Sequence, residues 1–158
     1  MTNYIYHYKV LDSNALFQLK LEADMEKPSW SQLHEKLKKL AKVLTEYANW
    51  IERKEPTIDQ IDQIQMILSG MGQTVIDLMK MEPEFVVHYS NTDSAKEKRA
   101  LEGFYLLMES ANDAISTMVS FPQASSLEKE LFGAWCKGLD YMMASVNGLA
   151  TKEAAPRN

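Results

Sequence analysis

The sequence predicts a mainly α-helical protein, an antiparallel up-and-down four-helix bundle with an N-terminal β-hairpin. Two observations predict this fold class. Four long segments repeat apolar residues at alternating steps of three and four, and the first two dozen residues alternate with a period of two. With 158 residues the chain can bury a substantial core in a single domain. We assign residues 1–150 to this domain and residues 151–158 to a disordered tail.

The hairpin is predicted over residues 4–23. Tyr4, Tyr6 and Tyr8 occupy alternate positions before a turn-forming stretch at 12–14, and the alternation resumes after it. Because a lone hairpin is only marginally stable in water, it should pack on the bundle, gain another strand or meet a partner. The run at 85–89 is a candidate third short strand.

The first two helices are predicted at about 28–53 and 57–82. The seam of the first consists of Trp30, Leu33, Leu37, Leu40, Leu44, Tyr47 and Ile51, and that of the second of Ile64, Leu68, Met71, Val75 and Leu78. Thr57 and Gln60 form a candidate capping box, and Pro83 is expected to end the second helix. Gly70 and Gly72 lower helix propensity, so we interpret them as allowing close approach of a neighbouring helix.

The last two helices are predicted at about 93–120 and 126–149. Their seams consist of Leu101, Phe104, Met108, Ala111, Ile115 and Met118, and of Phe132, Trp135, Leu139, Met142, Val146 and Ala150. Ser125 and Glu128 form a second candidate capping box. Short connections favour antiparallel neighbours, which completes the bundle.

Charge and composition disfavour several functional classes. Seventeen Lys and Arg against 22 Asp and Glu give a net charge of −5, which disfavours direct nucleic-acid binding. No apolar run approaches the ~20 residues of a membrane span. Residues 1–10 do not resemble a signal peptide. One cysteine excludes a disulfide framework and predicts a reducing, cytoplasmic setting.

No spacing in the sequence predicts a catalytic or metal site. The chain has three histidines, and none follows a glutamate by three residues, as the di-iron sites of helical bundles require. Cys136 lies among apolar residues on the fourth segment, so we interpret it as a packed, inert thiol. The sequence therefore indicates no catalytic residue, no metal ligand and no cofactor, and it leans against an enzyme.

Two sets of residues are candidates for binding a partner. Helical geometry points one apolar set away from the seams: Met66, Ile76, Leu106 and Tyr141. Together with the hairpin tyrosines these could form a binding patch or a second layer of core. The other set is an acidic patch consisting of Asp59, Asp62, Asp77, Glu82 and Glu84.

These features favour a non-enzymatic protein–protein interaction module, such as an adaptor, a dedicated chaperone or an inhibitor. It would bind through exposed apolar helix residues or the tyrosine-rich hairpin edge, and homodimerisation would use the same features. One alternative is a bundle that binds a small apolar ligand or carries out unrecognised chemistry. Another is an acidic regulator that occludes a basic nucleic-acid-binding site on a partner.

Overall fold

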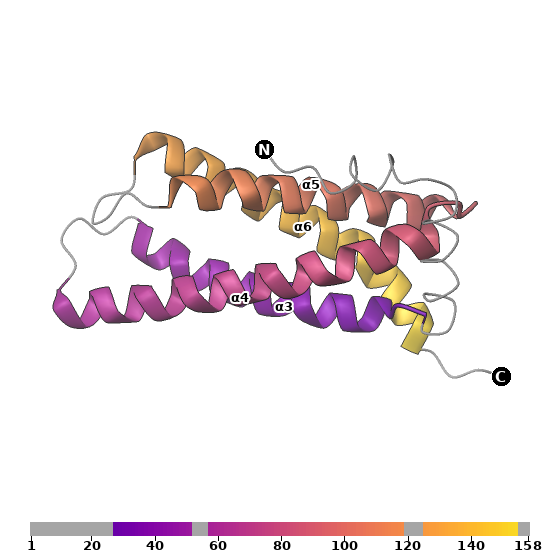
Figure 1. Cartoon of the computed structure of the whole chain (residues 1–158), viewed down its shortest axis with the longest axis horizontal. Coiled ribbons are helices and arrows are strands. Elements are labelled where there is room, and N and C mark those ends of the chain that lie inside the picture. The colour runs from indigo at the N-terminus through magenta and orange to yellow at the C-terminus, as the bar shows by residue number, and fades with distance from the viewer. Residues whose placement is uncertain (1–26, 52–56, 119–124, 155–158) are drawn as a thin grey trace.

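Four α-helices lie within residues 27–51, 57–118 and 125–154, the part of the chain that the computed structural model describes (Figure 1). They are α3 (Trp30–Ile51), α4 (Ile58–Tyr89), α5 (Ala95–Thr117) and α6 (Ser126–Ala154). Each helix packs against the next, and α6 returns to pack against α3. The predicted four-helix bundle is therefore confirmed for these residues.

The β-structure in the predicted fold class is wrong. The described residues contain no strand, and residues 85–89, the expected third strand, form the last turns of α4. The predicted hairpin, residues 4–23, lies outside the described residues. The ends of two helices also differ from the prediction, because α4 continues past residue 82 and α6 reaches Ala154, into the segment assigned to a tail.

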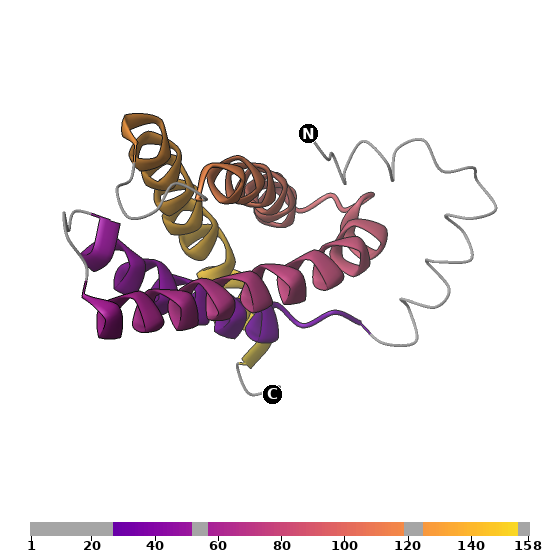
Figure 2. The ribbon, with the colours of Figure 1, turned by 60° about the vertical axis from the view of Figure 1, so that its left-hand side comes forward.

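α4 passes through Pro83 because its apolar seam does not stop at Leu78. Steps of four and three continue through Glu82, Phe85 and Tyr89, and all three side chains are buried. A proline inside a helix costs about 3 kcal/mol, whereas burying two aromatic side chains contributes roughly 1.5–3 kcal/mol each. The burial of Phe85 and Tyr89 therefore outweighs the cost of Pro83 within the helix. Figure 2 shows α4 curving along its length, with its last turns rising toward α5.

Side-chain caps define the starts of the helices. Thr57 and Gln60 form the predicted capping box, with Oγ1 of Thr57 accepting from the Gln60 N–H at 3.3 Å and Oε1 of Gln60 accepting from the Thr57 N–H at 2.9 Å. Ser94 caps α5 through the Glu97 N–H. At α6 the Ser125 hydroxyl accepts from the Glu128 N–H at 3.1 Å, which is one half of the second predicted box. Each cap satisfies an N–H that has no partner within its helix.

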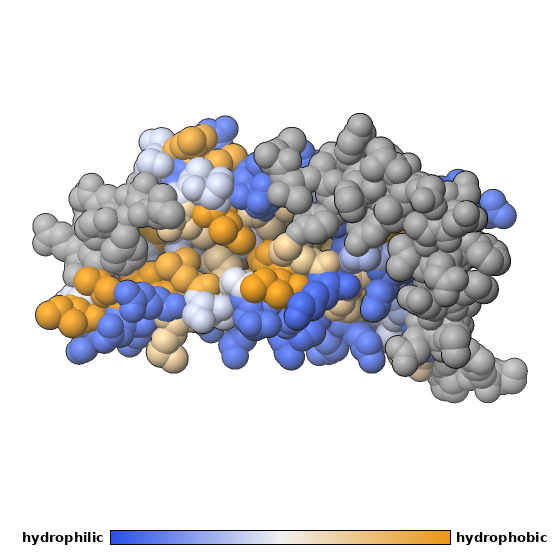
Figure 3. All heavy atoms as spheres, viewed as in Figure 1, coloured by the Kyte–Doolittle hydropathy of each residue, from blue (hydrophilic) through white to orange (hydrophobic). Residues whose placement is uncertain are grey.

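The core fills the centre of the bundle with the predicted seam residues. Trp135, Phe104 and Leu37 are at most 1% exposed. Some seam residues are only half-buried, namely Ile51, Leu68, Leu101, Ile115 and Met118. Most of these lie on α4 and α5, which contact each other least of the neighbouring helices. Figure 3 shows hydrophobic side chains gathered between these two helices and at the start of α4.

Close helix approach occurs at different glycines from those predicted. A Cβ atom on Gly72 would meet nothing within 4 Å, and one on Gly70 would lie 4.0 Å from Val43. By contrast, a Cβ on Gly103 of α5 would lie 3.1 Å from Sδ of Met142 on α6. Tight packing therefore joins α5 to α6, and the interpretation of Gly72 was wrong.

We expect Gly72→Ala to stabilise the protein by about 0.5–1 kcal/mol. The new methyl group has open space, and alanine loses less backbone entropy than glycine when a helix forms. Urea unfolding followed by circular dichroism measures the gain. Gly103→Ala is the matched control, because its methyl group must displace Met142; an equal gain in both variants would contradict this account of helix packing.

Candidate partner-binding site

A surface groove of about 320 Å³ lies between the start of α3 and the last turns of α4. Its lining consists of Pro28, Ser29, Gln32, Glu35 and Lys36 from the α3 side, and of Met81, Glu84 and Phe85 from α4. Pro28 and Ser29 precede α3, whereas the lining residues within each helix are spaced by three or four positions and so share one face of it. Half-buried Met81 supplies apolar surface, the buried Pro28 and Phe85 lie behind it, and the other residues supply a polar rim. We call this feature the α3–α4 groove.

The charges around the groove are partly paired. Nζ of Lys36 lies 3.0 Å from Oδ2 of Asp77, and the side-chain amide of Gln73 donates to the same carboxylate at 3.1 Å. The hydrogen bonds from Lys36 and Gln73 hold the pKa of Asp77 below its usual value. Lys36 therefore contributes little free positive charge to the rim. Glu35 and Glu84 are exposed, and the contact of Glu35 with Lys38 at 3.2 Å is a surface ion pair of little strength.

An aromatic cluster forms the wall behind the groove. The Phe85 ring lies 4.6 Å from Trp30 and 6.0 Å from Phe104, and Tyr89 lies 4.7 Å from Trp30. These distances and tilted orientations are typical of favourable aromatic pairs. The cluster joins the start of α3, the end of α4 and the middle of α5, so it fixes the shape of the groove.

Glu82 lies one residue beyond Met81 but points into the core. It is 0% exposed, and neither carboxylate oxygen has a hydrogen-bond partner within the described residues. Burial raises the pKa of Glu82 to about 7. A carboxyl in such a setting favours its neutral form, because ionisation would place an uncompensated charge in an apolar interior.

A second buried carboxyl, that of Glu128, lies in the first turn of α6. It is 1% exposed, and burial raises its pKa. Glu128 acts in turn on Tyr47, whose pKa is raised to about 12 by burial and by this carboxylate. Tyr47 also contacts Phe132 at 5.1 Å, so α3 and α6 meet here.

Glu153, near the end of α6, caps the start of α3. Its Oε2 accepts from the Trp30 N–H at 2.8 Å, its Oε1 accepts from the Ser31 N–H at 3.3 Å, and the Ser29 hydroxyl also donates to it. Burial acts to raise the pKa of Glu153, but these hydrogen bonds more than offset it, so the pKa is lowered. α3 has no acidic residue in its first turn, and Glu153 supplies the negative charge that a helix N-terminus favours.

We expect Glu153→Ala to lower the free energy of unfolding by about 1 kcal/mol at pH 7, as removal of a helix cap does. Because the folded-state pKa is lowered, this contribution is present above the ordinary glutamate pKa and is lost as pH falls through the folded value. Urea unfolding at pH 7 and pH 3 tests both statements. Asp140→Asn, an exposed change in the middle of α6, should have little effect, and an equal loss in both variants would contradict the capping role.

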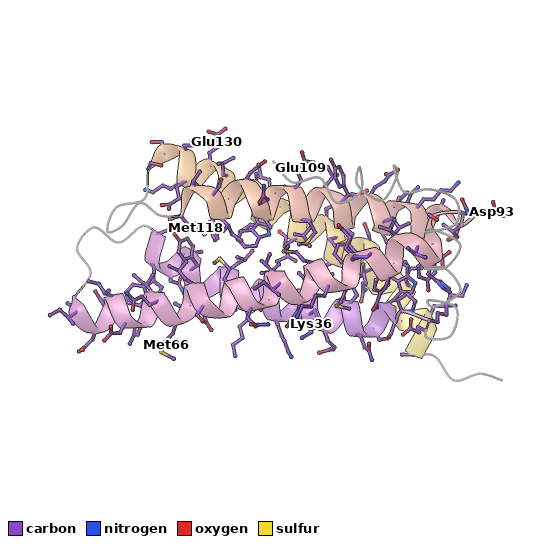
Figure 4. All side chains as sticks on the ribbon, viewed as in Figure 1. Lys36, Met66, Asp93, Glu109, Met118 and Glu130 are labelled. Atoms are coloured by element: carbon purple, nitrogen blue, oxygen red, sulfur yellow. The ribbon has the colours of Figure 1, made fainter. Side chains whose placement is uncertain are left out.

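The four outward apolar residues predicted on the helices are exposed. The exposed fraction is 76% for Met66, 45% for Ile76, 51% for Leu106 and 49% for Tyr141. Met66 points away from α5 (Figure 4), whereas Tyr141 lies against Gly103 on the α5–α6 side. The set is therefore divided between different faces, and none of its members lines the groove. Two further apolar residues escaped the prediction, Ile58 at 80% and Leu127 at 56%.

The five predicted acidic residues do not form one patch. Glu82 is buried and faces the core, and Asp77 is held by Lys36. The physical reason is helical geometry, since Glu82 lies roughly 140° around α4 from Asp77. Asp59, Asp62 and Glu84 are exposed, but Asp59 and Glu84 are separated by roughly 37 Å of helix. Only Glu84 lies at the groove.

Other predicted features are placed as follows. Tyr4, Tyr6 and Tyr8 lie outside the described residues. Cys136 is half-buried, and burial, with a smaller contribution from Asp140, raises the pKa of its thiol. Within residues 27–51, 57–118 and 125–154, no cluster of three or more potential metal ligands was found. No helix in the described part of the chain combines the length and the apolar character that crossing a membrane requires.

Neither the groove nor the Glu153 cap was predicted from the sequence. The position of Glu82 was accessible, because continuing the seam of 57–82 by its own spacing reaches Glu82, Phe85 and Tyr89. Pro83 concealed this continuation. The Glu153 cap had no comparable signal, since it joins residues more than 120 positions apart.

Comparison with known proteins gives no relative, because no family model, curated protein or solved structure matches this chain significantly.

Proposed function

We propose that this protein is a protein–protein interaction module and that the α3–α4 groove receives one large apolar side chain of a partner. The groove carries the proposal, because it combines the apolar surface of Met81, backed by the buried Pro28 and Phe85, with a polar rim. Protein interfaces commonly have this anatomy, in which an apolar anchor is buried inside a polar ring. A cytoplasmic setting belongs to the proposal, since the chain has one cysteine.

The rim indicates the chemistry of the partner. Glu35 and Glu84 are exposed carboxylates at the groove, while the charge of Lys36 is largely compensated by Asp77. A partner segment with a basic residue beside its apolar anchor would complement both features. Such a segment could come from another protein or from a second copy of this chain, and the first fits the charge argument better because the net charge here is −5.

Selection from a library of displayed 16-residue peptides tests the proposal. Enriched peptides should carry one Phe, Trp or Leu flanked by Lys or Arg. Met81→Glu and Glu84→Lys should each weaken their binding at least tenfold. Met66→Glu is the matched control, since it places the same charge on an exposed methionine of α4 that lies away from the groove. An absence of enriched peptides, or binding that only Met66→Glu disrupts, would refute the proposal.

A small apolar ligand is a second candidate. A volume of about 320 Å³ lies at the lower end of the range for ligand pockets. Titration with indole, followed by NMR shifts of the Phe85 and Met81 side chains, tests this candidate. Saturation at these residues would favour the ligand over a peptide anchor, and shifts spread over the surface would reject it.

A further inference from the structure

Glu82 occupies a core position whose surroundings do not stabilise a charge. It lies in the α4 seam between Leu78 and Phe85, with both oxygens buried and unpaired within the described residues. Phe85 contacts Trp30 of α3 and Phe104 of α5, so the surfaces facing this stretch of α4 are apolar. An ionised carboxylate here is shielded from bulk solvent and has no hydrogen-bond donor in the described part of the chain.

The charged groups on the surrounding helices interact with residues other than Glu82. Lys36 of α3 is engaged with Asp77, and Glu97 of α5 and Glu153 of α6 act on Tyr89. On α4 itself the titratable neighbours are Lys80, Glu84, His88 and Tyr89. None of these groups contributes to the raised pKa of Glu82, for which burial alone is responsible. Within residues 27–51, 57–118 and 125–154, no cation therefore stabilises the ionised form in place.

The residue after Glu82 is the weakest point in the backbone of α4. Pro83 has no N–H to donate to the carbonyl of Met79, and its ring disfavours a straight helix. Only residues 84–89 of the helix follow it. This segment is held to the bundle by side chains, chiefly Phe85 and Tyr89 against Trp30.

We propose that Glu82 and Pro83 make the last turns of α4 a pH-controlled segment, which packs against Trp30 while the carboxyl is protonated and opens when the carboxyl ionises. Pro83 is the hinge, and opening brings the carboxylate to water. Because Phe85 and Glu84 line the α3–α4 groove, opening also changes the groove. The inference does not depend on the proposed function, since the movement needs no partner.

Hydrogen exchange of backbone amides, corrected for the intrinsic pH dependence of exchange, measures this opening. If the open segment restores the ordinary pKa of Glu82, its opening equilibrium rises by roughly two orders of magnitude between pH 5 and pH 8. The protection factors of amides 85–89 should fall by that factor. Amides 71–78, on the other side of Pro83, should not follow.

Three variants identify the group responsible. Glu82→Gln, or Glu82→Met if the amide variant does not fold, should remove the pH dependence of amides 85–89. Glu84→Gln should retain it, because Glu84 is exposed. His88→Gln should also retain it, which separates the carboxyl from the imidazole that lies 4.6 Å from Tyr89. Constant protection from pH 5 to pH 8 in the wild type, or a pH dependence that His88→Gln abolishes, would overturn the proposal.

Discussion

At pH 8, Glu82→Met should raise the free energy of unfolding by about 3 kcal/mol. The wild-type carboxyl has a pKa of about 7 when folded against an ordinary value near 4.5, and each unit of pKa corresponds to about 1.4 kcal/mol. Because the folded-state pKa is raised, the wild type is most stable below pH 4.5, and it loses stability as pH rises to about 7. Methionine is similar in size and cannot ionise.

Urea unfolding from pH 4 to pH 8.5 provides the measurement. The wild-type free energy of unfolding should fall over this range relative to that of Glu82→Met. The difference between the two proteins should shrink toward pH 4.5. Glu84→Met is the matched control, because it replaces an exposed glutamate two positions away. A difference that does not change with pH would show that Glu82 has the same pKa in the folded and the unfolded protein.

Trp135→Ala should destabilise the protein by about 3–5 kcal/mol, the usual cost of truncating a buried aromatic side chain. Trp135 is 0% exposed on α6 and lies among the largest fully buried side chains of the core. Its indole N–H has no hydrogen-bond partner in the described residues. Trp135→Phe should therefore cost clearly less, because it keeps most of the apolar volume and removes a buried, unpaired donor.

Thermal and urea unfolding of the two variants checks this expectation. Met66→Ala removes a side chain that is 76% exposed and should change stability by less than about 0.5 kcal/mol. A loss for Trp135→Phe as large as that for Trp135→Ala would mean that the indole N–H makes a bond that stabilises the fold.

Helical periodicity predicted the bundle well and the ends of its elements less well. Residues such as Leu33, Leu37 and Trp135 are buried where the spacing places them. Residues 85–89 were misassigned because a run of aromatic and β-branched residues suits a strand locally, and Pro83 suggested a boundary. Tertiary burial of Phe85 and Tyr89 decided the outcome, and local propensity does not contain that information.

The candidate site was harder to predict because it depends on how helices pair. Periodicity gives the direction of each side chain around its own helix, so the exposure of Met66 and Tyr141 was accessible. The α3–α4 groove requires the register between two helices, which Lys36 with Asp77 and Trp30 with Phe85 define. Without that register, a sequence indicates which side chains are exposed but not which of them lie side by side.

The hydrogen bonds that Ser29 and Trp30 donate to Glu153 bring the first and last described turns of the chain together. This proximity makes the fold suitable for circular permutation. In such a variant a short linker joins the residues next to Ser29 and Glu153, and the new termini are placed in a connection between two other helices. It also means that a fluorescent donor and an acceptor attached at residues 27 and 154 would lie at the same end of the bundle. The energy transfer between them would report on whether the start of α3 and the end of α6 stay in contact.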